Sequence, residues 1–228
     1  MSLKIGIVGL ANVGKSSLFN ALTNAGALAA NYPFATIEPN TGIVGVPDER
    51  LNVLAKMYGA AKTVPATVEF VDIAGLIAGA SKGEGLGNKF LANIRECEVI
   101  CHVVRAFEDK NVTHVANEVN PKKDIETVEL ELALADIETL EKVIPKYHKE
   151  TKSGDKAAIK REAIAQKALD ELKAGKMHVE PVEGLNLLSA KPVFYMFNMD
   201  ENELVDEAKK KELAEMVAPQ KCVFVNAK

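Results

Sequence analysis

The residues with the most distinctive chemistry lie near the N terminus, where Gly9 to Ser16 read G-L-A-N-V-G-K-S. This run has the spacing G-x-x-x-x-G-K-S and lies between an apolar run at 5–8 and residues 17–22, which favour a helix. A strand, a glycine-bounded loop and a helix in this order form a concave site in which backbone N–H groups and the helix N terminus attract phosphate. Lys15 can reach the β- and γ-phosphates, and the Ser16 hydroxyl can ligate Mg²⁺. The sequence therefore predicts a nucleoside triphosphate site, with the candidate contacts Asn12, Val13, Gly14, Lys15, Ser16 and Ser17.

A second group of residues could sense the γ-phosphate and complete a Mg²⁺ site. An apolar run ends at Asp72, and the four residues from Asp72 to Gly75 read D-x-x-G. In P-loop proteins an Asp at this place holds the magnesium shell, and Gly75 lets a backbone amide approach the γ-phosphate. The segment 31–40 has two prolines, no helical period and a threonine between apolar residues, so we expect Thr36 to supply a second oxygen ligand. The predicted Mg²⁺ ligands are Ser16, Thr36 and Asp72.

The purine base would meet the segment Asn198-Met199-Asp200-Glu201, which follows an apolar run. The guanine-specific form of this loop is N-K-x-D, whose Asp accepts hydrogen bonds from guanine N1–H and N2–H₂. Here the carboxylate at that position belongs to Glu201, one methylene longer, and Met199 replaces the lysine. Because selectivity comes from polar groups that the wrong base leaves unpaired, this loop should favour ATP, with contacts from Asn198, Met199 and Glu201. In the alternative, Asp200 takes the role by a shift of one residue and GTP use is preserved.

Hydrolysis needs a group that orients the attacking water, and position 76 does not offer the usual one. Many signalling GTPases have Gln just after D-x-x-G, whereas this chain has Leu76, so either another residue acts or turnover is slow. The candidate catalytic residues are Lys15 and His114, since a histidine titrates near pH ~6.5 and suits proton handling. Taken alone, His114 also fits a surface or helix-capping role. Asn12 is a candidate for helping to coordinate K⁺, which would supply charge in place of an arginine finger.

Apolar, β-branched runs recur along the chain as expected buried strands, at 3–8, 68–71, 99–104, 193–197 and 222–225. Helical patterns separate several of them, at 15–24, 88–96 and 202–217. This alternation indicates an α/β fold with a mostly parallel sheet and helices on both faces, whose active loops lie at the carboxyl ends of the strands.

The segment from Asp124 to about Gly175 breaks that alternation because it is charged, rich in Ala and Leu, and helical throughout. It carries two apolar stripes on either side of a break at 152–155, which predicts an inserted antiparallel helical hairpin with an internal seam. The first stripe comprises Leu130, Leu134, Ile137, Leu140 and Ile144, and the second comprises Ala158, Ala165, Leu169 and Leu172. The charges on the other faces are expected to be solvated.

Bulk properties exclude some classes of function. The 228-residue chain is 47% hydrophobic and has a net charge of −4, so any nucleic-acid contact would need a local basic patch. Its longest apolar stretches are strand-sized and residues 1–4 run straight into the first strand, so we expect a cytoplasmic protein with no membrane partner. The three cysteines, Cys97, Cys101 and Cys222, lie in or beside apolar runs and are expected to be reduced thiols, most of them buried.

The motifs together resemble the Obg-like ATPase family, YchF type. They are the P-loop, the segment N-Y-P-F-A-T-I-E-P-N, D-I-A-G-L, the stretch G-E-G-L-G-N-K-F-L-A-N-I-R at 83–95, and N-M-D-E. The resemblance covers essentially the whole chain, and the Glu-ended base loop together with Leu76 separates this branch from ordinary Obg GTPases. It implies a translation-factor-class P-loop NTPase fold, ATP preference, Mg²⁺ dependence, association with the ribosome or its RNA or protein, and a contribution of His114 to hydrolysis.

The expected domain division is a P-loop domain of residues 1–123 and 190–228 with a helical domain, 124–189, inserted into it. Proteins of this type usually continue into a C-terminal TGS domain, whereas this sequence ends at Asn226-Ala227-Lys228, a tail that resembles the last base-contacting loop. A ribosome contact that needs the TGS domain would then not be expected of this chain.

Three functions remain open from the sequence. The first is a slow, Mg²⁺-dependent ATPase that acts as a switch, because the γ-phosphate would hold the Thr36 and Gly75 segments together until hydrolysis. The second is an Obg-like GTPase with the same parts. The third is a nucleotide-gated binding module whose helical hairpin contacts RNA or protein and whose hydrolysis is incidental.

Overall fold

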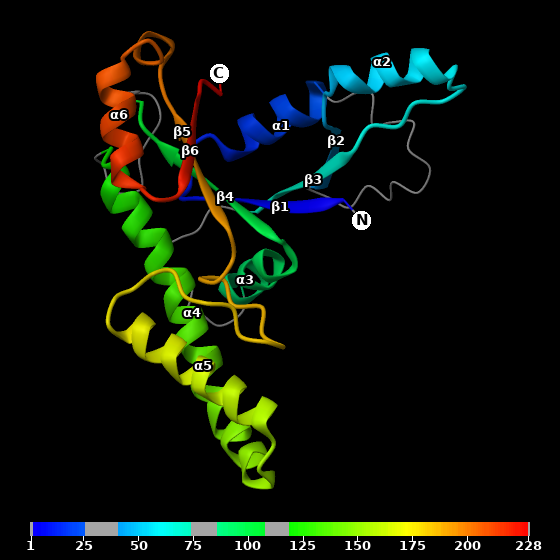
Figure 1. The fold of residues 1–228 in the computed structure, drawn as a ribbon. Helices are drawn as coiled ribbons and strands as arrows, with labels where there is room; N and C mark the ends of the chain where they lie inside the picture. Colours follow the sequence, from blue (N-terminus) through cyan, green and yellow to red (C-terminus); the bar gives the residue numbers. More distant parts are fainter. Residues whose placement is uncertain (1, 26–40, 74–85, 108–118, 228) are drawn as a thin grey trace.

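The computed structural model describes residues 2–25, 41–73, 86–107 and 119–227, and within them the chain forms a six-stranded sheet (Figure 1). The strand order is β2-β3-β1-β4-β5-β6; β2 runs antiparallel to β3, and the other neighbouring pairs are parallel. The bounds are β1 (Leu3–Val8), β2 (Thr41–Gly45), β3 (Thr67–Asp72), β4 (Val99–Arg105), β5 (Val193–Asn198) and β6 (Lys221–Val225). The mostly parallel sheet predicted from the apolar runs is confirmed, and β2 is a strand that those runs did not indicate.

Strand β1 lies at the centre of the sheet because its side chains are apolar on both faces. Ile5, Ile7 and Val8 are buried, and β1 pairs with β3 on one side and β4 on the other. A strand buried on both faces reads as a continuous apolar run rather than an alternating one. The loop that leaves β1 therefore begins at the middle of the carboxyl edge of the sheet, where ligands bind in open α/β sheets.

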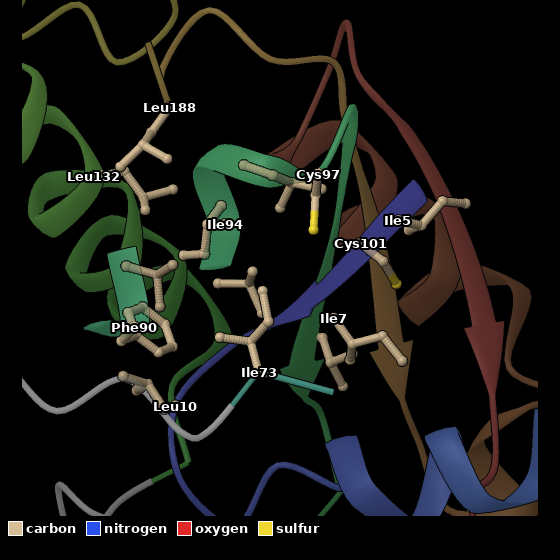
Figure 2. Close-up of a cluster of buried hydrophobic side chains, with 14 of the residues drawn as sticks. Ile5, Ile7, Leu10, Ile73, Phe90, Ile94, Cys97, Cys101, Leu132 and Leu188 are labelled. Carbon is tan, nitrogen blue, oxygen red and sulfur yellow. The ribbon is translucent and has the colours of Figure 1, made fainter. Parts of the chain in front are cut away.

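Helices cover both faces of the sheet, as predicted (Figure 1). Helix α1 lies on one face, and α3, α4 and α6 lie on the other, where Leu213 of α6 and Ile125 of α4 join one apolar cluster with Tyr195 of β5. The bounds are α1 (Lys15–Ala25), α2 (Glu49–Tyr58), α3 (Leu86–Glu96), α4 (Pro121–Glu150), α5 (Lys156–Lys173) and α6 (Glu207–Met216). Figure 2 shows Ile94 of α3 and Leu132 of α4 on one side of β1 and Ile7 of β1 on the other; all three belong to the main core, which also buries Cys97 and Cys101.

The helix predicted over 202–217 is two elements, and the reason is local capping. A short 3₁₀ helix, η3 (Glu201–Glu203), comes first, and α6 begins only after Asp206, whose side chain accepts hydrogen bonds from Ala208 N and Lys209 N. An Asp that caps the amide groups of the first turn starts a new helix at that point. The apolar pattern alone did not indicate this break.

Helices α4 and α5 form the predicted antiparallel hairpin, joined by the 3₁₀ turn η2 (Thr151–Ser153) and Gly154 (Figure 1). The predicted stripe on α5 is confirmed, since Ala158, Ala165, Leu169 and Leu172 are all buried. The stripe on α4 is wrong at Leu130, whose side chain is 47% exposed. The first half of α4 packs on the sheet through Val128 and Leu132, so its buried face differs from that of the second half, which packs on α5.

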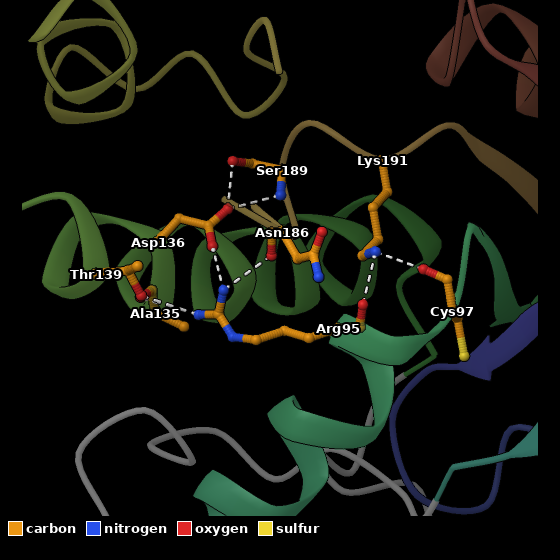
Figure 3. A network of polar contacts seen from close by, with 8 residues as sticks. All are labelled: Arg95, Cys97, Ala135, Asp136, Thr139, Asn186, Ser189 and Lys191. Carbon is orange, nitrogen blue, oxygen red and sulfur yellow. Dashed lines mark hydrogen bonds and ion pairs between the residues drawn. The ribbon is translucent and has the colours of Figure 1, made fainter. Parts of the chain in front are cut away.

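A polar network attaches the hairpin to helix α3 (Figure 3). The Asp136 carboxylate is fully buried; one oxygen accepts hydrogen bonds from Ser189 N at 2.7 Å and Ser189 Oγ at 2.6 Å, and the other lies 3.5 Å from Arg95 Nη1. Arg95, in the last turn of α3, also donates to Asn186 O and to Thr139 Oγ1. Because α4 starts at Pro121 and its first half lies in the main core, the domain boundaries at 124 and 189 stay a prediction.

Candidate functional site

The loop that joins β1 to α1 depends on two glycines at its ends. Gly9 has φ +155°, and a Cβ there would lie 2.4 Å from the carbonyl oxygen of Val103. Gly14 has φ +100°, and a Cβ there would lie 2.3 Å from Asn198 Nδ2. Asn12 between them has φ +62°, a left-handed conformation that asparagine tolerates. The backbone of this loop therefore curves too tightly, and too close to β4 and β5, for side chains at its ends.

Lys15 is the first residue of α1, and its side chain folds back under the loop. Its ammonium donates a hydrogen bond of 2.6 Å to Leu10 O, and the residue is only 6% exposed. Burial lowers the pKa of Lys15 to about 8, and the nearby Asp72 carboxylate opposes the shift. A buried ammonium with one carbonyl partner binds readily to a ligand that brings negative charge. Its position agrees with the predicted contact to a triphosphate.

Ser16 and Asp72 bring two oxygen atoms together at the carboxyl edge of the sheet. The Ser16 hydroxyl donates to Asp72 Oδ2 at 2.9 Å, although the two residues are 56 positions apart. Asp72 is placed there by the pairing of β1 with β3, in which Ile7 is its register partner. Mg²⁺ takes oxygen ligands in octahedral geometry at 2.0–2.1 Å, which puts adjacent ligands about 2.9 Å apart. The donor type and spacing of this pair therefore fit Mg²⁺.

Asn198 connects the phosphate loop to the other end of the site. Its Nδ2 donates to Val13 O at 3.0 Å, and its Oδ1 accepts from Ala227 N at 3.1 Å. Both halves of the side-chain amide thus contact backbone in two loops that are far apart in the sequence. The sequence placed Asn198 among the nucleotide contacts; the structure adds that Asn198 holds these loops against each other.

The other residues of the base loop differ in exposure. Met199 is 1% exposed and packs in the apolar cluster with Phe197 and Leu213. Asp200 caps η3 through a capping box with Glu203, while Glu201 is exposed at the start of that turn. Lys209 fixes the same segment, because its ammonium pairs with Glu203 and contacts Ala106 O.

Three predicted site residues, Thr36, Gly75 and His114, lie outside the described residues. Of those that the structure describes, Val13, Gly14, Lys15, Ser16, Asp72 and Asn198 are brought to the carboxyl edge of β1, β3 and β5, and Asn12 and Ser17 are exposed beside them. Sequence reasoning did not foresee the backbone contacts of Leu10 O with Lys15 and of Ala227 N with Asn198, although Ala227 lies in the tail that resembles the last base-contacting loop. It also missed Arg105 at the end of β4, which is 1% exposed and donates from Nε to Phe107 O at 3.1 Å.

A separate polar cluster lies under the sheet, between β4, β5 and α4. His102 is buried beside Tyr195, with ring centroids 5.3 Å apart, and the Tyr195 hydroxyl donates to Glu129. Burial lowers the pKa of His102 to about 4, so the imidazole is neutral at pH 7. Burial also raises the pKa of Tyr195 above its usual range. These groups surround a small pocket that Lys191 and His178 also line.

The class of protein follows from these features. A central parallel strand, a glycine-bounded loop with a buried lysine, and a Ser–Asp pair at the next strand define a P-loop nucleoside triphosphatase fold of the G-domain type. The family model described as 50S ribosome-binding GTPase matches residues 4–152. The chain belongs to this family, and within it to the YchF type.

Curated relatives named ribosome-binding ATPase YchF match most of the chain. The protein from Pasteurella multocida is 53% identical over 211 residues, which are 89% of this chain and 58% of the relative. The protein from Bacillus subtilis is 50% identical over 225 residues, which are 95% of this chain and 62% of the relative. A solved structure titled YchF GTPase, from Schizosaccharomyces pombe, has a TM-score of 0.78 and 35% identity, and the match covers 99% of this chain and 66% of that one. The chain thus spans about three fifths of the length of these curated relatives.

Among the described helices, none combines the length and apolar character that a membrane span requires.

Proposed function

We propose that the chain binds MgATP and hydrolyses it slowly, acting as a nucleotide-dependent switch in association with the ribosome. The observation that carries the proposal is the buried Lys15 ammonium, held at Leu10 O beneath the glycine-bounded loop and next to the Ser16–Asp72 pair. This arrangement offers a positive charge, backbone amides and a divalent-cation site within one short stretch of the sheet edge.

In this proposal each group has a defined role. Lys15 exchanges the Leu10 carbonyl for the β- and γ-phosphate oxygens, which are stronger acceptors because they are charged. Ser16 and Asp72 hold Mg²⁺, which would neutralise charge that develops on the phosphate oxygens. Thr36 and Gly75 would close over the γ-phosphate, and their release after hydrolysis would be the switch.

Two groups are proposed to support hydrolysis in place of the missing glutamine. His114 would position the attacking water, and K⁺ coordinated with the help of Asn12 would supply positive charge. Substituting Ala for His114 and exchanging K⁺ for Na⁺ in single-turnover assays test the two groups separately. Equal rates in both salts would remove K⁺ from the mechanism, and an unchanged rate in the variant would remove His114.

The preference for ATP is supported by how the base loop uses its two carboxylates. Asp200 forms the capping box of η3 with Glu203, whereas Glu201 is exposed. A carboxylate that the capping box engages with the backbone amide of Glu203 is poorly placed to read guanine, which argues against the alternative in which Asp200 preserves GTP use. The relatives differ in their names, since the bacterial proteins are called ATPases and the fission yeast structure is called a GTPase. The base preference of this chain therefore needs its own measurement.

Calorimetry with ATP and GTP tests the proposal directly. Substituting Ala for Lys15 should abolish tight binding of both nucleotides, while Lys62→Ala, a change at an exposed lysine remote from the loop in sequence, should leave both unchanged. Retained affinity in the Lys15 variant would refute the assignment of the loop. Glu201→Asp should shift the ratio of the two affinities toward GTP by about 10- to 200-fold, the scale of a one-methylene discrimination. Glu212→Asp, at an exposed position on α6, is the matched control.

Ribosome association rests on the names of the relatives and on membership of the family. Cosedimentation of the 228-residue chain with ribosomes, with and without ATP, tests whether this part suffices. Failure to sediment would mean that the contact needs residues that the longer relatives have.

A further inference from the structure

Two adjacent carboxylates, Asp200 and Glu201, lie in the base loop of the proposed nucleotide site. Guanine presents N1–H and N2–H₂ as donors to a short carboxylate, whereas adenine has an acceptor at N1. Specificity is a difference between two affinities, so a site that prefers ATP must keep an aspartate away from the base as well as offer a group that suits adenine. The contacts that hold Asp200 therefore bear on the choice of base.

Asp200 is held as the N-cap of η3 by reciprocal hydrogen bonds with Glu203. The Asp200 side chain accepts from Glu203 N, and the Glu203 side chain accepts from Asp200 N at 3.4 Å. The Leu204 amide also donates to Asp200 O, at 3.1 Å. Because the bond from Asp200 N is long, its persistence depends on what fixes the Glu203 carboxylate.

Lys209 of α6 fixes that carboxylate and connects it to the sheet. Its ammonium pairs with Glu203 Oε1 and donates a hydrogen bond of 3.3 Å to the carbonyl of Ala106, the residue that follows β4. The side chains of Lys209 and Glu203 are 33% and 31% exposed, so water screens this ion pair less than a fully exposed one. The capping box is thus supported from outside the base loop.

Ala106 closes a circuit of contacts around the start of the base loop. Its N–H donates to Asn198 O at 2.8 Å, and its carbonyl accepts from Lys209. Asn198 is therefore fixed to the end of β4 directly, and Asp200 is fixed to the same residue through Lys209 and Glu203. The circuit holds the register in which the loop leaves β5.

We propose that Glu203 and Lys209 are positioning residues that set the purine selectivity of the site, because they keep Asp200 as a cap and leave Glu201 as the carboxylate that faces the base. This assignment of roles rests on the proposed binding of ATP. Asp200 can read guanine only after the capping box opens, so the free energy of opening counts against GTP and not against ATP. Weakening the box should therefore favour GTP alone.

A neighbouring ion pair on α6 provides a matched control. Lys210 lies 2.8 Å from Glu207, one turn earlier on the same helix. Both residues belong to α6, so this pair is local to the helix, whereas Lys209 and Glu203 join α6 to η3. Comparing the two pairs separates the loss of a charge on α6 from an effect on the base loop.

Calorimetry with ATP and GTP on the 228-residue chain tests the proposal through the ratio of the two affinities. Lys209→Met removes the charge and keeps a long apolar side chain, and Glu203→Ala removes the other partner. The controls are Lys210→Met and Glu207→Ala. Denaturant unfolding reports whether each variant is folded, and either Lys209→Met or Glu203→Ala suffices if the other does not fold.

Lys209→Met and Glu203→Ala should each move the affinity ratio toward GTP by about fivefold, which corresponds to about 1 kcal/mol, the typical contribution of a helix N-cap. The two controls should keep the wild-type ratio. Adding Lys209→Met to Asp200→Asn should produce no shift, because asparagine also caps helices but has a single acceptor atom for the two guanine donors. A general loss of structure would weaken both nucleotides alike and leave the ratio unchanged.

Three results would overturn the proposal and leave the nucleotide site itself intact. They are an unchanged ratio in Lys209→Met or Glu203→Ala, the same shift in the controls, and a shift that persists in the Asp200→Asn background. Equal affinities of the wild type for ATP and GTP would also overturn it. A wild type that binds neither nucleotide would instead refute the proposed function, and the selectivity roles of Glu203 and Lys209 with it.

Discussion

Asn198 offers the sharpest perturbation of the candidate site, because its side chain bonds only to backbone atoms in the contacts that the structure shows. Substitution by Ala removes the hydrogen bond to Val13 O at 3.0 Å and the one from Ala227 N at 3.1 Å. Each neutral hydrogen bond contributes about 1 kcal/mol net, so the free energy that holds the two loops together should fall by about 2 kcal/mol. At tenfold for every 1.4 kcal/mol, triphosphate binding should weaken by up to about 30-fold.

The two nucleotides should weaken by the same factor in this variant, since the amide holds the phosphate loop and does not select the base. Calorimetry with ATP and GTP on the wild type and on Asn198→Ala measures both factors, and Asn202→Ala, at an exposed position in η3, is the matched control. A loss confined to ATP would show that Asn198 reads the base directly. Affinities within twofold of the wild type would show that the link between the loops does not shape the site. Either result would refute the reasoning.

Three further changes test the framework around the site. Gly9→Ala should abolish ATP binding and lower the free energy of unfolding, measured with denaturant, by about 2 kcal/mol or more, because its Cβ would lie 2.4 Å from a backbone carbonyl of β4. Gly154→Ala, with open space around the new Cβ, should lower the free energy of unfolding by about 1 kcal/mol. Asp136→Ala should lower the free energy of unfolding by about 3 kcal/mol, because it leaves the buried partners of the carboxylate unsatisfied. Burial raises the pKa of this carboxyl, which means that its charge is costly, so Asp136→Asn should lower the free energy of unfolding by less. The exposed control Glu138→Ala should lower it by under about 0.5 kcal/mol. Equal losses in the two Asp136 variants would show that the charge, not the hydrogen bonds, is what matters. Burial lowers the pKa of His102 from 6.5 to about 4, so between these pH values the unfolded chain binds a proton that the folded protein does not. Stability should therefore fall by roughly 3 kcal/mol as pH drops from 7 to 4, a slope that His102→Phe should remove; if the variant keeps the slope, His102 is not its source.

The phosphate loop and the strands could be predicted because their signals are local. Residues 9–16 specify a tight turn by glycines at its two ends, and that requirement holds wherever the turn lies in the fold. The apolar runs that became β1, β4 and β5 are long enough to indicate strands buried on both faces. Strand β2 and helix α2 lacked such a signal, since β2 is only half buried at the edge of the sheet and α2 has no buried residue.

The buried face of α4 could not be read from its apolar period. The sequence pattern placed Leu130 on the internal seam, yet this side chain is exposed, while the carboxylate of Asp136 is fully buried. One helix that packs on the sheet in its first half and on α5 in its second half has no single stripe. The partners that allow Asp136 to be buried are the Ser189 backbone amide and hydroxyl and the Arg95 guanidinium; they come from other elements, so the apolar period of α4 does not reveal them.

The amino-acid sequence by itself indicated the P-loop motif, the type of fold, the helical hairpin and the resemblance to the YchF type, because contiguous residues carry those signals. The tertiary structure alone decided how that site is held. Asn198 meets Val13 across 185 positions of sequence only because β5 lies two strands from β1 in the sheet. Lys209 of α6 likewise contacts Glu203 and the Ala106 carbonyl only because α6 packs against β4 and β5. Such contacts depend on the order of strands and the packing of helices, which no local pattern encodes.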